Sequence, residues 1–142
     1  MKLTEIFQIK EGKKFSLPFF LANVPAGFPT PAEDYIDKTL DLNELLIAHP
    51  AATFFVRVAG DSMQGAGISS GDILIVDRAL EAVNGKIVVA IINGEFTVKR
   101  IQFCPEKILL IPENLNYPIL ELSPESDFQV WGVVTYVIHQ AK

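Results

Sequence analysis

Two short segments of the chain carry residue types that could act together as a nucleophile and a base. Ser62 lies in the segment Gly60-Asp61-Ser62-Met63, and Lys99 lies in Thr97-Val98-Lys99-Arg100. A serine hydroxyl attacks a carbonyl group only when a base removes its proton, and a lysine can be that base when its amine is neutral. The pair therefore predicts acyl transfer, the chemistry of amide-bond hydrolysis.

Each of these residues also has an ordinary structural explanation. Asp61 and Ser62 favour turns because their side chains hydrogen-bond the local backbone, and Asp61 is expected to serve the turn only. A lysine on an edge strand discourages aggregation. His49 and His139 offer an alternative base for the serine, but neither lies in a glycine-rich or strand-end setting. The residues alone therefore leave the serine–lysine pair as a hypothesis.

Glycines surround Ser62 and predict open space beside its hydroxyl group. Gly60 precedes it, and Gly65-Ala66-Gly67 follows shortly after. Small residues allow a substrate strand to approach closely, and they leave the backbone N–H of Ser62 or Met63 free to stabilise an oxyanion.

A peptide that could be the substrate lies on the same chain. The segment Pro25-Ala26-Gly27-Phe28-Pro29 is small and extended, because proline favours extended backbone in its neighbours. Two further Ala-Gly pairs, Ala59-Gly60 and Ala66-Gly67, flank Ser62 and are expected in its supporting loops. Ala26-Gly27 is therefore the pair predicted to enter a cleft as an extended strand.

The elements that would position Ser62 and Lys99 are short strands. From Ala52 onward, β-branched and aromatic runs alternate with turn residues, which predicts a compact, mainly β, mostly antiparallel domain. The strands are predicted at residues 53–58, 72–77, 86–92, 95–101, 107–111, 119–122 and 128–138. The apolar run 130–138 leaves two alternatives open: a central strand covered on both faces, or a strand that packs against a second subunit.

The Asn93-Gly94 pair predicts a two-residue hairpin turn, because both positions tolerate the positive φ of a type I′ turn. In such a hairpin Ile92 faces Glu95 and, counting outward, Val88 faces Lys99. Side chains alternate along a strand, so Lys99 is expected on an apolar face without a carboxylate partner. A buried lysine without a counter-ion has a lowered pKa, as the role of base requires.

Residues 1 to about 30 are predicted to form an arm. Residues 15–21 are apolar but interrupted by Pro18, so they are expected to lie extended against another surface. Short helices are predicted to begin at Thr30-Pro31-Ala32-Glu33 and at Asp41-Leu42-Asn43-Glu44, because both segments carry capping residues.

Composition excludes several classes of protein. With 142 residues, 49% of them hydrophobic, the chain fits one folded domain with a short arm. The formal net charge of −5 and the scattered basic residues argue against direct DNA binding.

The single cysteine, Cys104, cannot form an internal disulfide, and no Cys/His spacing suggests a metal, so no cofactor is expected. Neither a signal peptide nor a membrane span is found, and a cytoplasmic location is expected.

Several segments, read in order, form a specific combination: residues 26–35, 41–43, 49–53, 60–63, 71–77 and 94–99. In these segments, and over about residues 15–139, the chain resembles the UmuD/MucA proteins of the LexA-like family of self-cleaving serine peptidases. The resemblance implies a LexA-like or signal-peptidase-like β-domain at residues 27–142 and an arm, residues 1–26, that self-cleavage removes. It also implies a catalytic dyad of Ser62 and Lys99 and a scissile bond between Ala26 and Gly27.

The resemblance further implies partners. Cleavage would be stimulated by the RecA–single-stranded-DNA filament during the bacterial SOS response. The shortened product would act as a homodimer and as an accessory subunit of a UmuC-type translesion polymerase.

Three other classes share parts of this pattern. A LexA-like transcriptional regulator needs a DNA-binding helical domain before the cut, and the 26 residues that precede Gly27 are too few for one. A type I signal peptidase needs a membrane anchor, which is not expected here. A non-catalytic interaction module is expected if Lys99 is exposed and charged.

Overall fold

The computed structural model describes residues 1–9, 16–20 and 36–142. They belong to two units, one formed by residues 1–9 and 49–142 and the other lying within residues 10–48. In the smaller unit, β2 (Ser16–Phe20) pairs antiparallel with β3 (Ile36–Asp41), and α1 (Leu42–Leu46) follows. Within the described ranges, no helix is long and apolar enough to cross a membrane.

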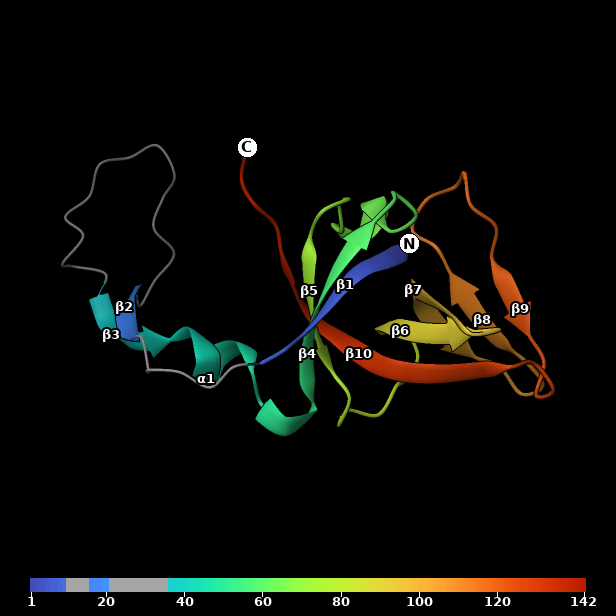
Figure 1. Ribbon diagram of the computed structural model, residues 1–142, viewed down its shortest axis with the longest axis horizontal. Coiled ribbons are helices and arrows are strands. Elements are labelled where there is room, and N and C mark those ends of the chain that lie inside the picture. The colour runs from blue at the N-terminus through green and yellow to red at the C-terminus, as the bar shows by residue number, and fades with distance from the viewer. Residues whose placement is uncertain (10–15, 21–35) are drawn as a thin grey trace. The chain divides into compact units, whose positions relative to one another are not determined.

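The larger unit is built on one eight-stranded antiparallel sheet, shown in Figure 1, with strand order β1-β4-β5-β10-β6-β7-β8-β9. Its strands are β1 (Lys2–Gln8), β4 (Thr53–Ala59), β5 (Ile73–Asp77), β6 (Ile87–Ile92), β7 (Glu95–Phe103), β8 (Ile108–Ile111), β9 (Leu120–Leu122) and β10 (Phe128–Ile138). Two short 3-10 helices, η2 (Pro50–Ala52) and η3 (Gln64–Ala66), flank β4. The predicted mainly β, antiparallel fold is confirmed.

The local predictions agree closely with these elements. Every strand predicted after Ala52 is present, with ends that differ by two residues or fewer. Asn93 and Gly94 have φ values of 50° and 80°, and Val88 pairs with Lys99 as the hairpin required. The side chain of Asp41 accepts a hydrogen bond from the Asn43 N–H and caps α1 as predicted. The helix start predicted at residues 30–33 lies outside the described residues.

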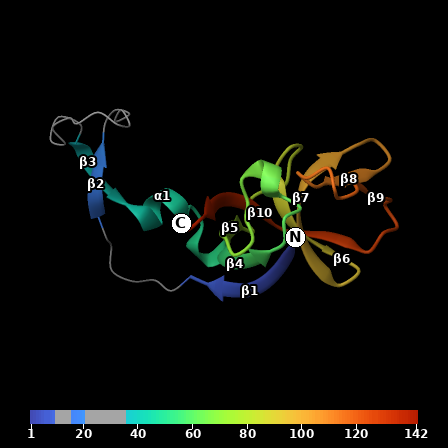
Figure 2. The same cartoon turned by 90° about the horizontal axis from the view of Figure 1, so that it is seen from above.

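Strand β10 joins the two halves of the sheet (Figures 1 and 2). Its first part pairs with β6 and its second part with β5, with register shifts along both pairings. A Cβ atom on Gly132 would lie 2.5 Å from Cγ1 of Val76, so a larger residue would not fit where β10 crosses from one half to the other. The sequence left two alternatives for this segment, a central strand or a strand that packs against a second subunit. β10 lies centrally, between β5 and β6. Its end still leaves Tyr136 and Ile138 exposed, at 43% and 44%.

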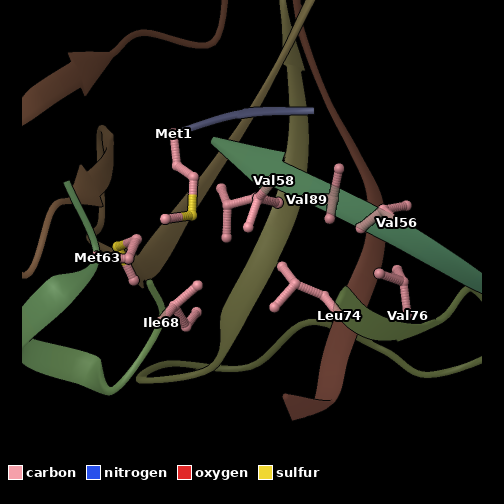
Figure 3. Close-up of a cluster of buried hydrophobic side chains, with 9 residues drawn as sticks. Met1, Val56, Val58, Met63, Ile68, Leu74, Val76 and Val89 are labelled. Atoms are coloured by element: carbon pink, nitrogen blue, oxygen red, sulfur yellow. The ribbon is translucent and has the colours of Figure 1, made fainter. Parts of the chain in front are cut away.

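The sheet curls until its first strand reaches β7. The N–H of Val98 donates a hydrogen bond of 3.3 Å to the backbone oxygen of Met1. An apolar cluster fills the curl, and Figure 3 shows most of it: Met1, Val56, Val58, Met63, Ile68, Leu74, Val76, Val89 and Val98. A second cluster, which includes Val88, Ala90 and Ile101, packs between β6, β7 and their neighbours. The curl brings the turn after β4 close to β7.

Strand β1 differs from the arm that was expected from residue 1. Its residues pair with β4 from Lys2 opposite Ala59 to Gln8 opposite Phe54. Within β1, Leu3 is half-buried and all other residues are exposed. An edge strand can form with so little burial because backbone hydrogen bonds to one neighbour hold it. Its sequence therefore lacks the apolar alternation that identifies a strand.

Candidate active site

Ser62 lies in a tight turn directly after β4. Gly60 has a φ of 101°, a conformation that glycine adopts easily, and it ends the strand. The turn is closed by a hydrogen bond from the Gln64 N–H to the backbone oxygen of Asp61. Met63, the next residue, is fully buried in the apolar cluster and anchors the turn. Ser62 itself is only 1% exposed, so its hydroxyl group faces the interior.

Lys99 reaches this hydroxyl group from β7. Its Nζ lies 3.2 Å from Ser62 Oγ and 3.0 Å from Thr97 Oγ1, and it donates a hydrogen bond to the backbone oxygen of Val98. The Lys99 side chain is buried, with 6% of the residue exposed. The structure thus brings together the two residues that the sequence singled out, although 37 positions separate them.

Burial of Lys99 favours its neutral form. Desolvation lowers the pKa of Lys99 below its ordinary value of 10.5, and the hydrogen bond with the Met1 amino group opposes this shift in part. None of the ion pairs formed among the described residues involves Lys99. The predicted apolar face without a carboxylate partner is therefore present in this part of the chain.

The backbone around Ser62 offers donors to a bound oxygen. In the ranges that the structure describes, the N–H groups of Ser62 and Met63 donate no hydrogen bond to another residue. Two such donors beside a nucleophile are the usual arrangement for stabilising an oxyanion.

A loop between β8 and β9 holds the serine turn in place. The Gly65 N–H donates a hydrogen bond of 2.8 Å to the Glu113 oxygen, and Asn114 Nδ2 donates one of 2.9 Å to the Asp61 oxygen. The Tyr117 hydroxyl group donates to the Asp61 carboxylate, which raises the pKa of Tyr117. A Cβ atom on Gly65 would lie 2.7 Å from the Glu113 oxygen. The space predicted for a substrate at Gly65 is therefore filled by this loop.

The same loop contacts the strand that carries the lysine. Arg100, the residue after Lys99, forms an ion pair with Glu113, with 2.5 Å between Nε and Oε1. The loop between β8 and β9 thus contacts both the turn that carries Ser62 and the strand that carries Lys99. Together with the apolar core, it sets the position of Lys99 relative to Ser62.

A cleft of about 580 Å³ lies beside the lysine, with a lining that includes Lys99, Thr97, Phe96, Glu95, Tyr117 and Leu120. A smaller hollow of about 220 Å³ extends to Ser62, Gly60 and Asp61. Met1 and Lys2 line both spaces. The Ala26-Gly27 bond lies outside the described residues.

Comparison with known protein families establishes the family of the chain. Residues 18–135 match the model of the Peptidase S24-like family. The chain belongs to the Peptidase S24-like family. It is therefore related to serine peptidases, and the buried serine lies within the matched range.

Individual relatives agree with this S24 assignment. Protein SamA of Salmonella typhimurium is 49% identical over 133 residues, which are 94% of this chain and 92% of SamA. Protein MucA of Escherichia coli is 46% identical over 122 residues, 85% of this chain and 83% of MucA. Both are UmuD-like SOS mutagenesis proteins, so the resemblance is confirmed. The LexA repressor of Delftia acidovorans is 36% identical over 139 residues, 92% of this chain and 62% of the repressor.

The two histidines of this S24 protein lie in other interactions. His49 Nδ1 is 2.6 Å from Asp77 Oδ2, and His139 Nδ1 is 2.6 Å from Asp72 Oδ1. In the described part of the chain, the side-chain and terminal groups that contact Ser62 Oγ are Lys99 Nζ and the Met1 amino group. A histidine base is therefore not supported, in agreement with the sequence analysis.

Two parts of the S24 site had no signal in the sequence. The anchoring loop was missed because Glu113, Asn114 and Tyr117 lie about 50 residues after the serine, in a polar connection without a motif. The position of Met1 at Ser62 was missed because residues 1 to about 30 were predicted to form an arm.

Proposed function

We propose that this S24 protein is a self-cleaving serine peptidase in which Ser62 is the nucleophile and Lys99 is the general base. The observation that carries the proposal is the 3.2 Å distance between Ser62 Oγ and Lys99 Nζ inside a buried site. The lowered pKa of Lys99 supports it, because a neutral amine then exists at a pH closer to neutrality.

The chemistry follows from these positions. Neutral Lys99 takes the proton of Ser62 Oγ as that oxygen bonds to the carbonyl carbon of Ala26. The N–H groups of Ser62 and Met63 donate to the oxyanion that forms. The Lys99 ammonium returns the proton to the departing amine of Gly27 as the C–N bond breaks. Water, activated again by Lys99, then hydrolyses the ester on Ser62.

The cut is expected between Ala26 and Gly27. Mass spectrometry of the incubated protein should therefore find a product whose first residue is Gly27. A Gly27→Glu variant should not be cut, because a large charged side chain would crowd the cleft beside Lys99. A product with another N-terminus would show that the assignment of the bond is wrong.

We further propose that the protein acts in SOS mutagenesis, with the RecA filament as stimulator and a UmuC-type polymerase as the partner of a homodimeric product. Its similarity to SamA and MucA over most of both chains supports this role. The exposed Tyr136 and Ile138 at the end of β10 offer apolar surface to a second subunit.

RecA filaments on single-stranded DNA are expected to accelerate self-cleavage at neutral pH. The rate is measured by gel electrophoresis with filaments and, as a control, with single-stranded DNA alone. An unchanged rate with assembled filaments would contradict the proposed role in the SOS response.

A further inference from the structure

The start of β1 lies at the reactive centre. The amino nitrogen of Met1 donates a hydrogen bond of 2.8 Å to Ser62 Oγ, and the Met1 backbone oxygen accepts one of 3.3 Å from Val98. One residue thus bridges the serine turn and the strand that carries Lys99. An extended peptide must lie in the same gap if Ser62 is to attack it while Lys99 takes the proton.

The side chain of Met1 fixes this position. Figure 3 shows it pointing from β1 into the apolar cluster, toward Met63 and Val58. Met1 is 9% exposed, and a Cβ atom on Gly60 would lie 3.8 Å from the Met1 Cα atom. Met1 is therefore packed against the serine turn by both its side chain and its backbone.

We propose that Met1 and Lys2 form an internal ligand of the peptide cleft, which must leave before a substrate strand can reach Ser62. The inference rests on the proposed function and adds a regulatory step to it. Ser62 lines a hollow of about 220 Å³ whose lining also includes both residues. The Ala26-Gly27 segment and the start of β1 cannot occupy this space together.

The amino group of Met1 also competes with Lys99 for the serine. Burial, together with the nearby Lys99, lowers the pKa of the Met1 amine from 8.0 to about 5. At neutral pH this amine is mainly uncharged, and its N–H group donates the 2.8 Å hydrogen bond to Ser62 Oγ. This hydrogen bond occupies a lone pair of the oxygen that must attack, so displacement of β1 would both open the cleft and free the nucleophile.

The rest of β1 is suited to reversible release. Among the described strands it lies at one edge of the sheet and pairs with β4 alone, and this pairing is irregular between Leu3 and Glu5. Midway along it, Glu5 Oε1 lies 3.5 Å from Arg57 Nε in an exposed ion pair. Edge strands with little burial open locally far more often than the whole protein unfolds.

The test measures access to position 62 without using catalysis. A Ser62→Cys, Cys104→Ser chain carries one thiol, and its rate of reaction with N-ethylmaleimide reports how often β1 opens. Adding Glu5→Lys places two cations opposite each other and should raise this rate by about threefold. The matched control is Glu121→Lys, which breaks the similar exposed pair with Lys107 on the other edge of the sheet.

A stronger variant makes the result unambiguous. Leu3→Asp removes the apolar contact of β1 with the cluster and should raise the labelling rate about tenfold or more. The control is Val83→Asp, at an exposed loop site, which should leave the labelling rate unchanged. Circular dichroism verifies that each chain is folded. Unchanged labelling in both Glu5→Lys and Leu3→Asp, or equal acceleration in the controls, would overturn the proposal.

Self-cleavage is measured separately, in chains that keep Ser62. Glu5→Lys and Leu3→Asp should then cut faster than the unmodified chain. If labelling responds as expected but no chain cuts itself, the internal ligand stands and the proposed peptidase function fails.

Discussion

Replacing Ser62 by alanine is expected to abolish self-cleavage, and Lys99→Ala is expected to slow it by at least about 10²–10⁴-fold. The first change removes the attacking oxygen, and the second removes the amine that lies 3.2 Å from it. The amount of the Gly27 product is measured over time by gel electrophoresis and mass spectrometry. Both variants should keep the fold, because neither residue forms an ion pair among the described residues.

Two further substitutions separate the chemistry of Lys99 from its charge and packing. Lys99→Arg should be inactive, because a guanidinium group stays protonated in proteins. Thr97→Val keeps the shape of the neighbour at 3.0 Å but removes its hydroxyl group, so it should slow cleavage only in part, by about tenfold. Cutting at the unmodified rate in Ser62→Ala, Lys99→Ala or Lys99→Arg would refute the dyad.

The face of Lys99 could be predicted because its information is local. Asn93 and Gly94 fix a two-residue turn, and counting outward from that turn sets Val88 opposite Lys99. The alternation of side chains then decides which neighbours the lysine has. The cap of α1 at Asp41 was predictable for the same reason. Each of these conclusions needs only a few adjacent residues.

The assembly of the site could not be derived from such local rules. Ser62 meets Lys99 because β10 joins the two halves of the sheet and because the sheet curls, and neither feature has a local signature. The pairing of the two residues was expected from the family resemblance. Met1 shows the same limit, since its contact with Ser62 spans 61 positions and depends on an edge strand without apolar alternation.

Self-cleavage is expected to rise with pH from about 7 and to level off below pH 10.5, the ordinary pKa of lysine. Below the pKa of Lys99, the neutral fraction of its amine increases about tenfold for each pH unit. Desolvation lowers that pKa in the folded chain, so the plateau should begin earlier than it would for an exposed lysine. The midpoint of the profile, measured from initial rates without RecA, reads the pKa of Lys99 directly.

Unfolding does not explain the rise of cleavage with pH, because the titration of Lys99 does not destabilise the fold as the pH increases. Between the lowered pKa and 10.5, the unfolded chain binds a proton on Lys99 that the folded chain has lost, so titration of this residue stabilises the fold as the pH increases. In this window cleavage should therefore have reached its plateau while the contribution of Lys99 to stability is still rising. Hydroxide acting alone would give a rise without a plateau, and that rise would persist in Lys99→Ala. A flat or falling profile between pH 7 and 10 in the unmodified chain would mean that Lys99 is not the base.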